Sequence, residues 1–251
     1  MTDTHCHLFS EYYDDIGAVI ERAKDNGVDK IIVNGCDRKS NYEVIKLISK
    51  YENVYGAIGF HPSECDIVTE DDYEFIIDNI NNNKIVAIGE IGLDYHYDNY
   101  NKNKQIELFK RQIDIANLYN KPIIIHCRDS INDAYNILEN VIVPKILHCY
   151  SGSLEMASRF IKNSNNVYFG VGGVVTFKNS KVVKDVVKNI PLSKIVFETD
   201  SPYLSPEPYR GSKNEPKNIK FICDYVSSLR GLKNGDVQAV VEETVRSIFD
   251  I

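Results

Sequence analysis

The chain has 251 residues, of which 43% are hydrophobic and 26% are charged, and its formal net charge at pH 7 is −7. This composition is typical of a globular protein, and the length allows one large α/β barrel or two smaller domains. The negative charge argues against a protein that holds nucleic acid on a broad basic face. No apolar run approaches the ~20 residues that span a bilayer, so we expect no contact with a membrane.

The amino-terminal residues and the cysteines predict a cytoplasmic protein without disulfide bonds. Asp3, His5 and His7 stand near the start, where a secretory leader has basic residues and then an apolar stretch. The six cysteines are scattered along the chain, and no Cys-x-x-Cys pair occurs. That spacing is not typical of a disulfide framework.

Eight short apolar runs rich in valine and isoleucine alternate with helix-like stretches, which predicts βα units and a parallel sheet. Their nearly continuous hydrophobicity is typical of strands that are covered on both faces. The runs span residues 2–7, 30–34, 54–60, 85–89, 122–126, 145–148, 167–171 and 194–198.

The stretches between these runs have helical periodicity. Residues 105–120, for example, carry apolar side chains at three- and four-residue steps, which gives one apolar stripe. Gly27 stands where a left-handed residue ends the first such helix. Residues 201–216 contain four prolines and predict a long ordered loop, and helical sequence follows to the carboxyl terminus.

Eight βα units in this length predict a TIM-type (β/α)8 barrel, and the absence of a linker or repeat predicts a single domain over residues 1–251. A doubly wound open sheet is the alternative. It would place a glycine-rich phosphate-binding turn after the first strand, and two histidines stand there instead.

Histidines and carboxylates gather at the carboxyl ends of the predicted strands, which is where TIM barrels carry their active sites. Only His96 lies farther into a loop. The residues at strand ends are His5, His7, His61, Glu90, His126, His148 and Asp200.

The first and last strands predict one metal site. Side chains alternate along a strand, so His5 and His7 point the same way while Cys6 points to the opposite face. Neutral imidazoles bind zinc, manganese or iron, and a carboxylate completes such a site. Asp200 is in place to do so because the first and eighth strands are neighbours in a closed barrel.

A second metal site is predicted on the fifth and sixth strands, where His126 and His148 stand side by side. Glu90 on the fourth strand is placed to bridge both sites, which would hold two ions about 3.5–4 Å apart, as in two-metal hydrolases. Cys127 and Cys149 adjoin these histidines, but strand alternation turns them away, as it does Cys6, and we expect all three to be buried apolar side chains.

The motifs that carry these residues resemble those of the TatD family of metal-dependent deoxyribonucleases, over nearly the whole chain. In order, they are "DTHCHL", "GFHP", "AIGEIGLDY", "KPIIIHCRD", "HCYSGS", "ETDSPYL" and "RGSKNEP". The resemblance implies a TIM-barrel hydrolase with a two-metal centre that acts on nucleic-acid phosphodiesters. It implies His5, His7 and Asp200 as ligands of one ion, His126 and His148 of the other, and Glu90 between them.

The chain departs from the family at Phe9, where an acidic residue usually follows "HCHL", and this affects loop contacts rather than the ligands. The resemblance further suggests 3′-to-5′ exonuclease action on single-stranded DNA. Two divalent ions lower the pKa of a bound water and neutralise phosphate charge. We expect Glu90 and Asp200 to be catalytic, with Asp200 orienting the water and accepting its proton.

Substrate contacts are expected from loops on the same rim. Basic and imidazole side chains would bind phosphate, and tyrosines would stack on bases. The candidates for phosphate are His61, Arg128 and Arg210, with Lys178 and Lys213. The candidates for stacking are Tyr95, Tyr150 and Tyr203.

Other functions stay open from the sequence. A small-molecule amide or ester hydrolase of the same superfamily often bridges its metals with a modified lysine on strand four, whereas Glu90 stands there and Lys84 lies at the other end of the strand. An aminoacyl-tRNA ester hydrolase and a non-enzymatic scaffold are further alternatives.

The identity of the metal also stays open. Four histidines suit zinc or manganese, whereas enzymes that hydrolyse phosphodiesters often use magnesium. We expect a monomer.

Overall fold

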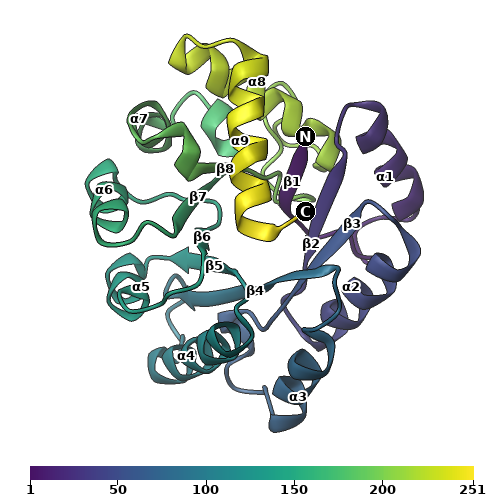
Figure 1. The fold of residues 1–251 in the computed structure, drawn as a ribbon, viewed down its shortest axis with the longest axis vertical. Helices are drawn as coiled ribbons and strands as arrows, with labels where there is room; N and C mark the ends of the chain where they lie inside the picture. Colours follow the sequence, from purple (N-terminus) through teal and green to yellow (C-terminus); the bar gives the residue numbers. More distant parts are fainter.

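Eight parallel strands alternate with helices and form a nearly closed barrel, which Figure 1 shows for residues 1–251 of the computed structural model. Each strand pairs with the next in chain order, from β1 to β8. The strands are β1 Thr2–Cys6, β2 Lys30–Asn34, β3 Val54–Ile58, β4 Ile85–Asp94, β5 Ile123–Arg128, β6 Lys145–Leu147, β7 Val167–Val171 and β8 Ile195–Phe197. The predicted TIM-type barrel is confirmed.

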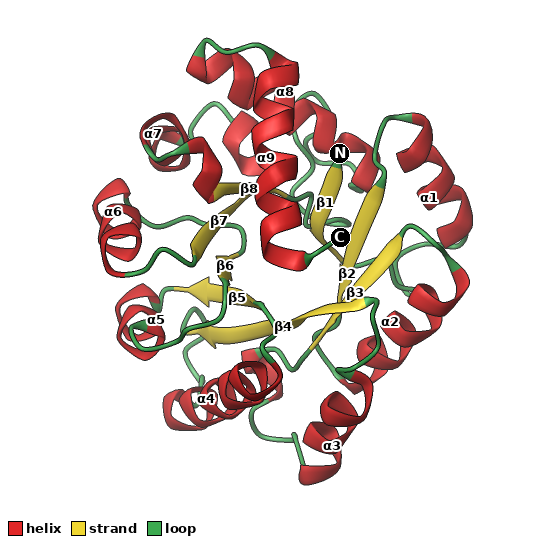
Figure 2. Ribbon diagram, in the orientation of Figure 1, coloured by secondary structure: helices red, strands yellow, loops and turns green.

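The helices surround the strands in the order expected of βα units (Figure 2). They are α1 Ile16–Asp25, α2 Arg38–Lys50, α3 Glu70–Asn79, α4 Lys102–Tyr119, α5 Ile131–Leu138, α6 Leu154–Asn163, α7 Lys181–Asn189, α8 Ile219–Arg230 and α9 Asn234–Phe249. None of them is both long and apolar enough to cross a membrane.

Hydrogen bonds join the last strand, and the segment that follows it, to the first strand and His7. The hydroxyl of Thr4 donates to the carbonyl of Phe197 at 2.9 Å. The N–H of Asp200 donates to the carbonyl of His5 at 2.9 Å, and the N–H of His7 donates to the carbonyl of Ser201 at 2.7 Å. These bonds hold the segment after β8 beside the end of β1, which brings Asp200 close to His5 and His7.

Two apolar clusters make up the core. The larger contains 54 buried residues and fills the space between strands and helices. The smaller contains ten, and it joins side chains of the strands to Val245, Ile248 and Phe249 of α9. Those three residues recur at three- and one-residue steps, so one face of α9 is apolar. In Figures 1 and 2, α9 crosses the centre of the barrel, and it closes the end where the strands begin.

Some elements end where local sequence signals predicted, and other elements have different bounds. Gly27 has a φ of +79° at the end of α1, as expected for a left-handed cap. The helical carboxyl-terminal region divides into α8 and α9, because Gly231 ends α8 with a φ of +65°. The strand predicted over residues 85–89 continues to Asp94, so Glu90 lies within β4 rather than after it.

The extension of β4 sets the register that the site depends on. Gly92 lies opposite His126, and Asp94 lies opposite Arg128 on β5. A Cβ atom added to Gly92 would lie 2.0 Å from the carbonyl oxygen of His126, so only glycine permits this close approach of the two strands.

Candidate metal centre and substrate cavity

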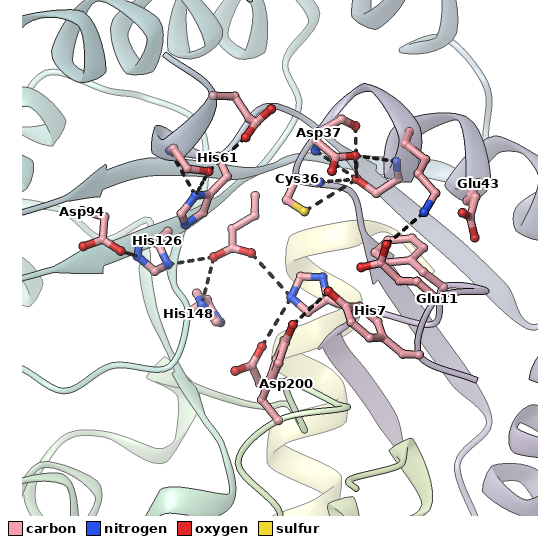
Figure 3. A pocket seen from close by; sticks show the side chains of 18 of the residues that line it. His7, Glu11, Cys36, Asp37, Glu43, His61, Asp94, His126, His148 and Asp200 are labelled. Carbon is pink, nitrogen blue, oxygen red and sulfur yellow. Dashed lines mark hydrogen bonds and ion pairs between the residues drawn. The ribbon is translucent and has the colours of Figure 1, made fainter. Parts of the chain in front are cut away.

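A cavity of about 680 Å³ opens at the carboxyl ends of the strands. Figure 3 shows imidazoles and carboxylates from different strands pointing into it. The ligands expected from the sequence that line it are His7, Glu90, His126, His148 and Asp200, and His5 lies fully buried beneath them.

Four donor atoms form a first set at one side of the cavity. The Nε2 atoms of His5 and His7 are 3.2 Å apart. Oε2 of Glu90 lies 3.5 Å from Nε2 of His5 and 3.6 Å from Nε2 of His7. Oδ1 of Asp200 lies 3.6 Å and 3.5 Å from the same two nitrogens. All four atoms therefore face one point.

A second set lies on the other side of Glu90. Its Oε1 is 2.8 Å from Nδ1 of His126 and 3.2 Å from Nε2 of His148. His61 also approaches this set, since its ring centre is 4.4 Å from that of His126. One oxygen of Glu90 thus faces each set of imidazoles, as the sequence predicted for a bridging carboxylate.

The donor set fits a divalent ion. Ligands at about 2.1 Å from one ion, at tetrahedral or octahedral angles, lie about 3.0–3.4 Å from one another. The separations in the first set are 3.2–3.6 Å. Imidazole with carboxylate suits zinc or manganese. The fit supports divalent-ion binding there, where His5, His7, Glu90 and Asp200 would hold the ion.

The electrostatics of the cluster favour cations. Burial alone would raise the pKa of Glu90, but the surrounding imidazoles, His148 first, outweigh burial and hold that pKa well below its usual range. Burial lowers the pKa of His61 to about 4, so this imidazole is neutral at pH 7. A carboxylate anion is the form of Glu90 that binds a metal ion. Burial opposes the charged form of His148, but Glu90 and Glu198 raise its pKa well above the usual range, so His148 would release a proton on binding an ion.

Groups behind the histidines orient their rings. Nδ1 of His7 lies 3.0 Å from the carbonyl oxygen of Asn34, and Nε2 of His126 lies 3.1 Å from Oδ2 of Asp94. Nδ1 of His148 lies 3.4 Å from Oε1 of Glu198. The carbonyl of Asn34 and the carboxylate of Asp94 are hydrogen-bonded outer acceptors, and such acceptors fix which ring nitrogen would face an ion.

Asp94 and Glu198 were not predicted from the sequence. Both stand an even number of positions from a predicted ligand, since Asp94 is four residues after Glu90 and Glu198 is two before Asp200. For Asp94 the available signal was alternation along the strand, and Asp94 and Glu90 do both line the cavity. Asp200 has a left-handed φ of +54°, so alternation gave no such signal for Glu198.

Three of the eight expected substrate contacts line the cavity: His61, Arg128 and Tyr203. Nδ1 of His61 accepts the N–H of Ser63 at 3.2 Å, which leaves Nε2 for the cavity. The side chain of Tyr203 is half exposed, and its hydroxyl lies 2.9 Å from that of Tyr12.

The other five, two tyrosines and three basic residues, lie outside the cavity that was expected to hold them. Tyr150 is 6% exposed and packs edge-to-face on Phe169, so its ring offers no free face for a base. Tyr95 stacks on Tyr100, and its hydroxyl donates to Asp133. These three-dimensional contacts of loop residues have no signature in a single sequence.

The basic candidates other than Arg128 lie outside the cavity. The guanidinium of Arg210 lies over Phe177, 4.2 Å from the ring centre, outside the cavity. Lys178 and Lys213 do not line it either, and Lys213 donates to the carbonyl of Tyr12. Lys84 directly precedes β4, and its Nζ donates to the carbonyls of Ile48 and Tyr51. It lies away from the centre, as expected.

None of the side-chain clusters with metal-binding geometry contains a cysteine. Sγ of Cys6 lies 3.6 Å from the carbonyl oxygen of Ile32, and Sγ of Cys127 lies 3.4 Å from the hydroxyl of Ser130. All six cysteines are free thiols, as predicted.

The family model described as TatD related DNase matches residues 2–250. The chain belongs to the TatD family. Its relatives are similar over their full length. The chain is 42% identical to an uncharacterized metal-dependent hydrolase, YabD, of Bacillus subtilis strain 168, covering 99% of this chain and 98% of that one. It is 34% identical to MJ1582 of Methanocaldococcus jannaschii, also an uncharacterized metal-dependent hydrolase, covering 98% and 96%.

The structure of YjjV, a TatD homologue from Escherichia coli K12, has a TM-score of 0.94 to this chain at 28% identity, covering 100% of this chain and 98% of that one. The resemblance to the TatD family that the motifs indicated is thus confirmed. As a member of the TatD family, the chain is a metal-dependent hydrolase, and its imidazole and carboxylate clusters support the use of divalent metal.

Proposed function

We propose that the protein is a deoxyribonuclease that removes nucleotides from single-stranded DNA in the 3′-to-5′ direction with two divalent ions. The observation that carries the proposal is the position of Glu90, with Oε2 facing His5 and His7 and Oε1 facing His126 and His148. A carboxylate shared by two donor sets is the arrangement of two-metal hydrolases. The description of the matching family, TatD related DNase, supports DNA as the substrate.

In this proposal the ions supply an activated water and neutralise charge on the scissile phosphate. His5, His7 and Asp200 would hold one ion, His126 and His148 would hold the other, and Glu90 would contribute to both. The side chain of Asp200 is 13% exposed, so it can hold a water in the cavity and accept its proton. Asp200 and Glu90 are the residues on which turnover depends most.

The cavity wall offers contacts to phosphate and bases. Arg128 lines it and supplies a guanidinium for a neighbouring phosphate. Lys39 also lines it, but it is paired with Glu11 at 2.9 Å. Tyr97 and Tyr203 are 62% and 48% exposed and offer ring faces. Stacking of this kind needs unpaired bases, which favours a single strand.

A second candidate is a small-molecule ester or amide hydrolase. Seven carboxylates line the cavity against two basic side chains, Lys39 and Arg128. Such a wall repels a polyanion that extends beyond the ions, and it favours a small neutral or cationic substrate. An aminoacyl-tRNA would combine a small cationic group with a polyanion, because the aminoacyl ester carries an amino group and the tRNA is polyanionic.

The test is a digestion of 3′- and 5′-labelled single-stranded DNA with Mg²⁺, Mn²⁺ or Zn²⁺, alongside a panel of small esters and an aminoacyl-tRNA. Loss of label from the 3′ end, one nucleotide at a time, supports the nuclease. His126→Asn should abolish it, whereas His96→Asn, a matched change outside the cavity, should not. Intact DNA together with hydrolysis of a small ester would reject the nuclease in favour of the second candidate.

The proposal treats the protein as a cytoplasmic monomer, as the sequence led us to expect. One chain supplies all the proposed ligands, so no second copy is needed to complete the centre. Light scattering after gel filtration should give the mass of one 28.6 kDa chain.

A further inference from the structure

Beneath the proposed centre lie three buried polar atoms without a hydrogen-bond partner: Nδ1 of His5, Nδ1 of His148 and Oε2 of Glu198. His5 and Glu198 are 0% exposed and His148 is 8% exposed. Buried polar atoms are rarely left unpaired, so such a group needs an explanation. Donor atoms of these three side chains lie within 4.8 Å of one another.

The two imidazoles face the same way. Their rings are stacked, with centres 3.9 Å apart and planes at 14°. Nε2 of His5 lies 3.5 Å from one oxygen of Glu90, and Nε2 of His148 lies 3.2 Å from the other. Because Nδ1 lies across the ring from Nε2, both Nδ1 atoms face away from Glu90. Nδ1 of His148 is 3.4 Å from Oε1 of Glu198.

The carboxylate of Glu198 has a fitted place in the barrel. The N–H of Cys149 donates to its Oε1. Gly170 on β7 leaves room for it, because a Cβ atom there would lie 2.3 Å from Oε2 and 2.7 Å from Cδ of Glu198. Both neighbours hold the carboxylate behind the histidines and away from the cavity.

We propose that Glu198 is a positioning residue for both donor sets. Its carboxylate accepts Nδ1–H of His148 and, through a small rotation or one buried water, Nδ1–H of His5. Both rings then keep Nε2 unprotonated toward the ions. His5 belongs to one set and His148 to the other, so one buried anion supports both ions. This inference extends the two-ion centre proposed above.

The other two proposed histidine ligands already have outer acceptors of their own. His7 has the carbonyl of Asn34 behind it, and His126 has Asp94. Only His5 and His148 lack a hydrogen-bonded outer acceptor. The one metal-binding cluster that contains both His5 and His148 is completed by Glu198.

The experiment compares Glu198→Ala, Glu198→Gln and Gly170→Ala with a control, Glu242→Gln. Glu242 accepts from the N–H and hydroxyl of Thr2, so the control loses hydrogen bonds to a carboxylate outside the cavity and outside every metal-binding cluster. Zn²⁺ affinity is measured by calorimetry. Nδ1–H protons of the zinc-loaded protein are observed by NMR, where a bond to a carboxylate shifts them to low field.

We expect Glu198→Ala to weaken Zn²⁺ binding about 10–100-fold at both ions and to remove two low-field Nδ1–H signals. Glu198→Gln should have a smaller effect, since its amide oxygen still accepts. Gly170→Ala should imitate Glu198→Ala by displacing the carboxylate, and combining the two should cost little further affinity. Glu242→Gln should match the wild type.

Wild-type affinity and two unchanged Nδ1–H signals in folded Glu198→Ala would overturn the inference. Loss of only the His148 signal would overturn the shared support of both sets. If Glu198→Ala does not fold, Glu198→Gln and Gly170→Ala decide the matter by the same two readouts. A wild-type protein that binds zinc with these signals but leaves DNA intact would refute the nuclease proposal alone.

Discussion

The guanidinium of Arg128 lies over the ring of Tyr97, with Cζ 5.7 Å from the ring centre, and both side chains line the cavity. The pair places a cation and an aromatic face side by side. It stands in a wall that is otherwise rich in carboxylates, so Arg128 should account for much of the attraction to a phosphate.

Arg128→Ala is expected to raise KM for single-stranded DNA about 10–100-fold, because a hydrogen bond to a charged group contributes about 1.5–3 kcal/mol. The dependence of log KM on log salt should also become shallower by about 1. Arg159→Ala is the matched control, since Arg159 lies 4.0 Å from the ring centre of Tyr135 outside the cavity. Equal KM values for the two variants would contradict the role of Arg128.

Removal of metal should lower the thermal stability. Glu90 and Asp200 are largely buried, and an ion between them offsets their mutual repulsion. Ligand at 100 times its Kd stabilises the folded state by about 2.7 kcal/mol, which corresponds to a rise in Tm of about 5–10 °C for a chain of this size. Scanning fluorimetry with chelator and then with Zn²⁺ measures the shift. His126→Asn should reduce it and His96→Asn should preserve it.

Glu90→Gln should lower the number of bound ions from two towards one. An amide offers a single oxygen, and its nitrogen is a hydrogen-bond donor that does not bind a cation, so one donor set loses its carboxylate. Turnover should fall by at least about 100-fold. Metal content after gel filtration gives the stoichiometry. Glu64→Gln changes another carboxylate of the cavity wall outside the donor sets. Two ions retained in Glu90→Gln would argue against a shared ligand.

Lys145 predicts a pH dependence of stability far from the centre. It is 1% exposed, and its Nζ donates to the carbonyls of Val141 and Val143. Burial lowers its pKa from 10.5 to about 8. The folded state therefore releases this proton at lower pH than the unfolded chain. The cost of burying the charge is fully present below pH 8 and disappears as the pH rises to 10.5.

Lys145→Met removes this cost. The stability of the variant relative to the wild type should be greatest below pH 8 and should decline between pH 8 and 10.5, by up to about 3 kcal/mol. The lost hydrogen bonds give an offset that does not vary with pH. Urea unfolding at several pH values measures the difference, and a difference that stays constant with pH would disprove the assignment.

The barrel could be predicted because its strands are buried on both faces and stand out as apolar runs. β4 was the exception: Glu90 and Gly92 interrupt its apolar run, so the pattern indicated an end at residue 89. Pairing with β5 extends the strand to Asp94, and pairing is a property of two segments together. The polar residues in β4 are there because they face the cavity.

The ligand candidates could be predicted because histidines are few and stand at strand ends. Their outer partners were missed, since carboxylates are frequent and only geometry distinguishes Glu198 from a surface glutamate. Tyr95 and Tyr150 lie outside the cavity for a related reason. Both follow strand ends in motifs, but their rings turn into packing contacts that depend on the distant residues Tyr100 and Phe169.

The closure of one barrel end by α9 has a consequence for turnover. Val245, Ile248 and Phe249 fill the space where the strands begin, so nothing can thread through the molecule. In the proposed reaction, a released nucleotide departs by the passage through which the strand arrived. The DNA strand then cannot advance until the released nucleotide has left through that passage.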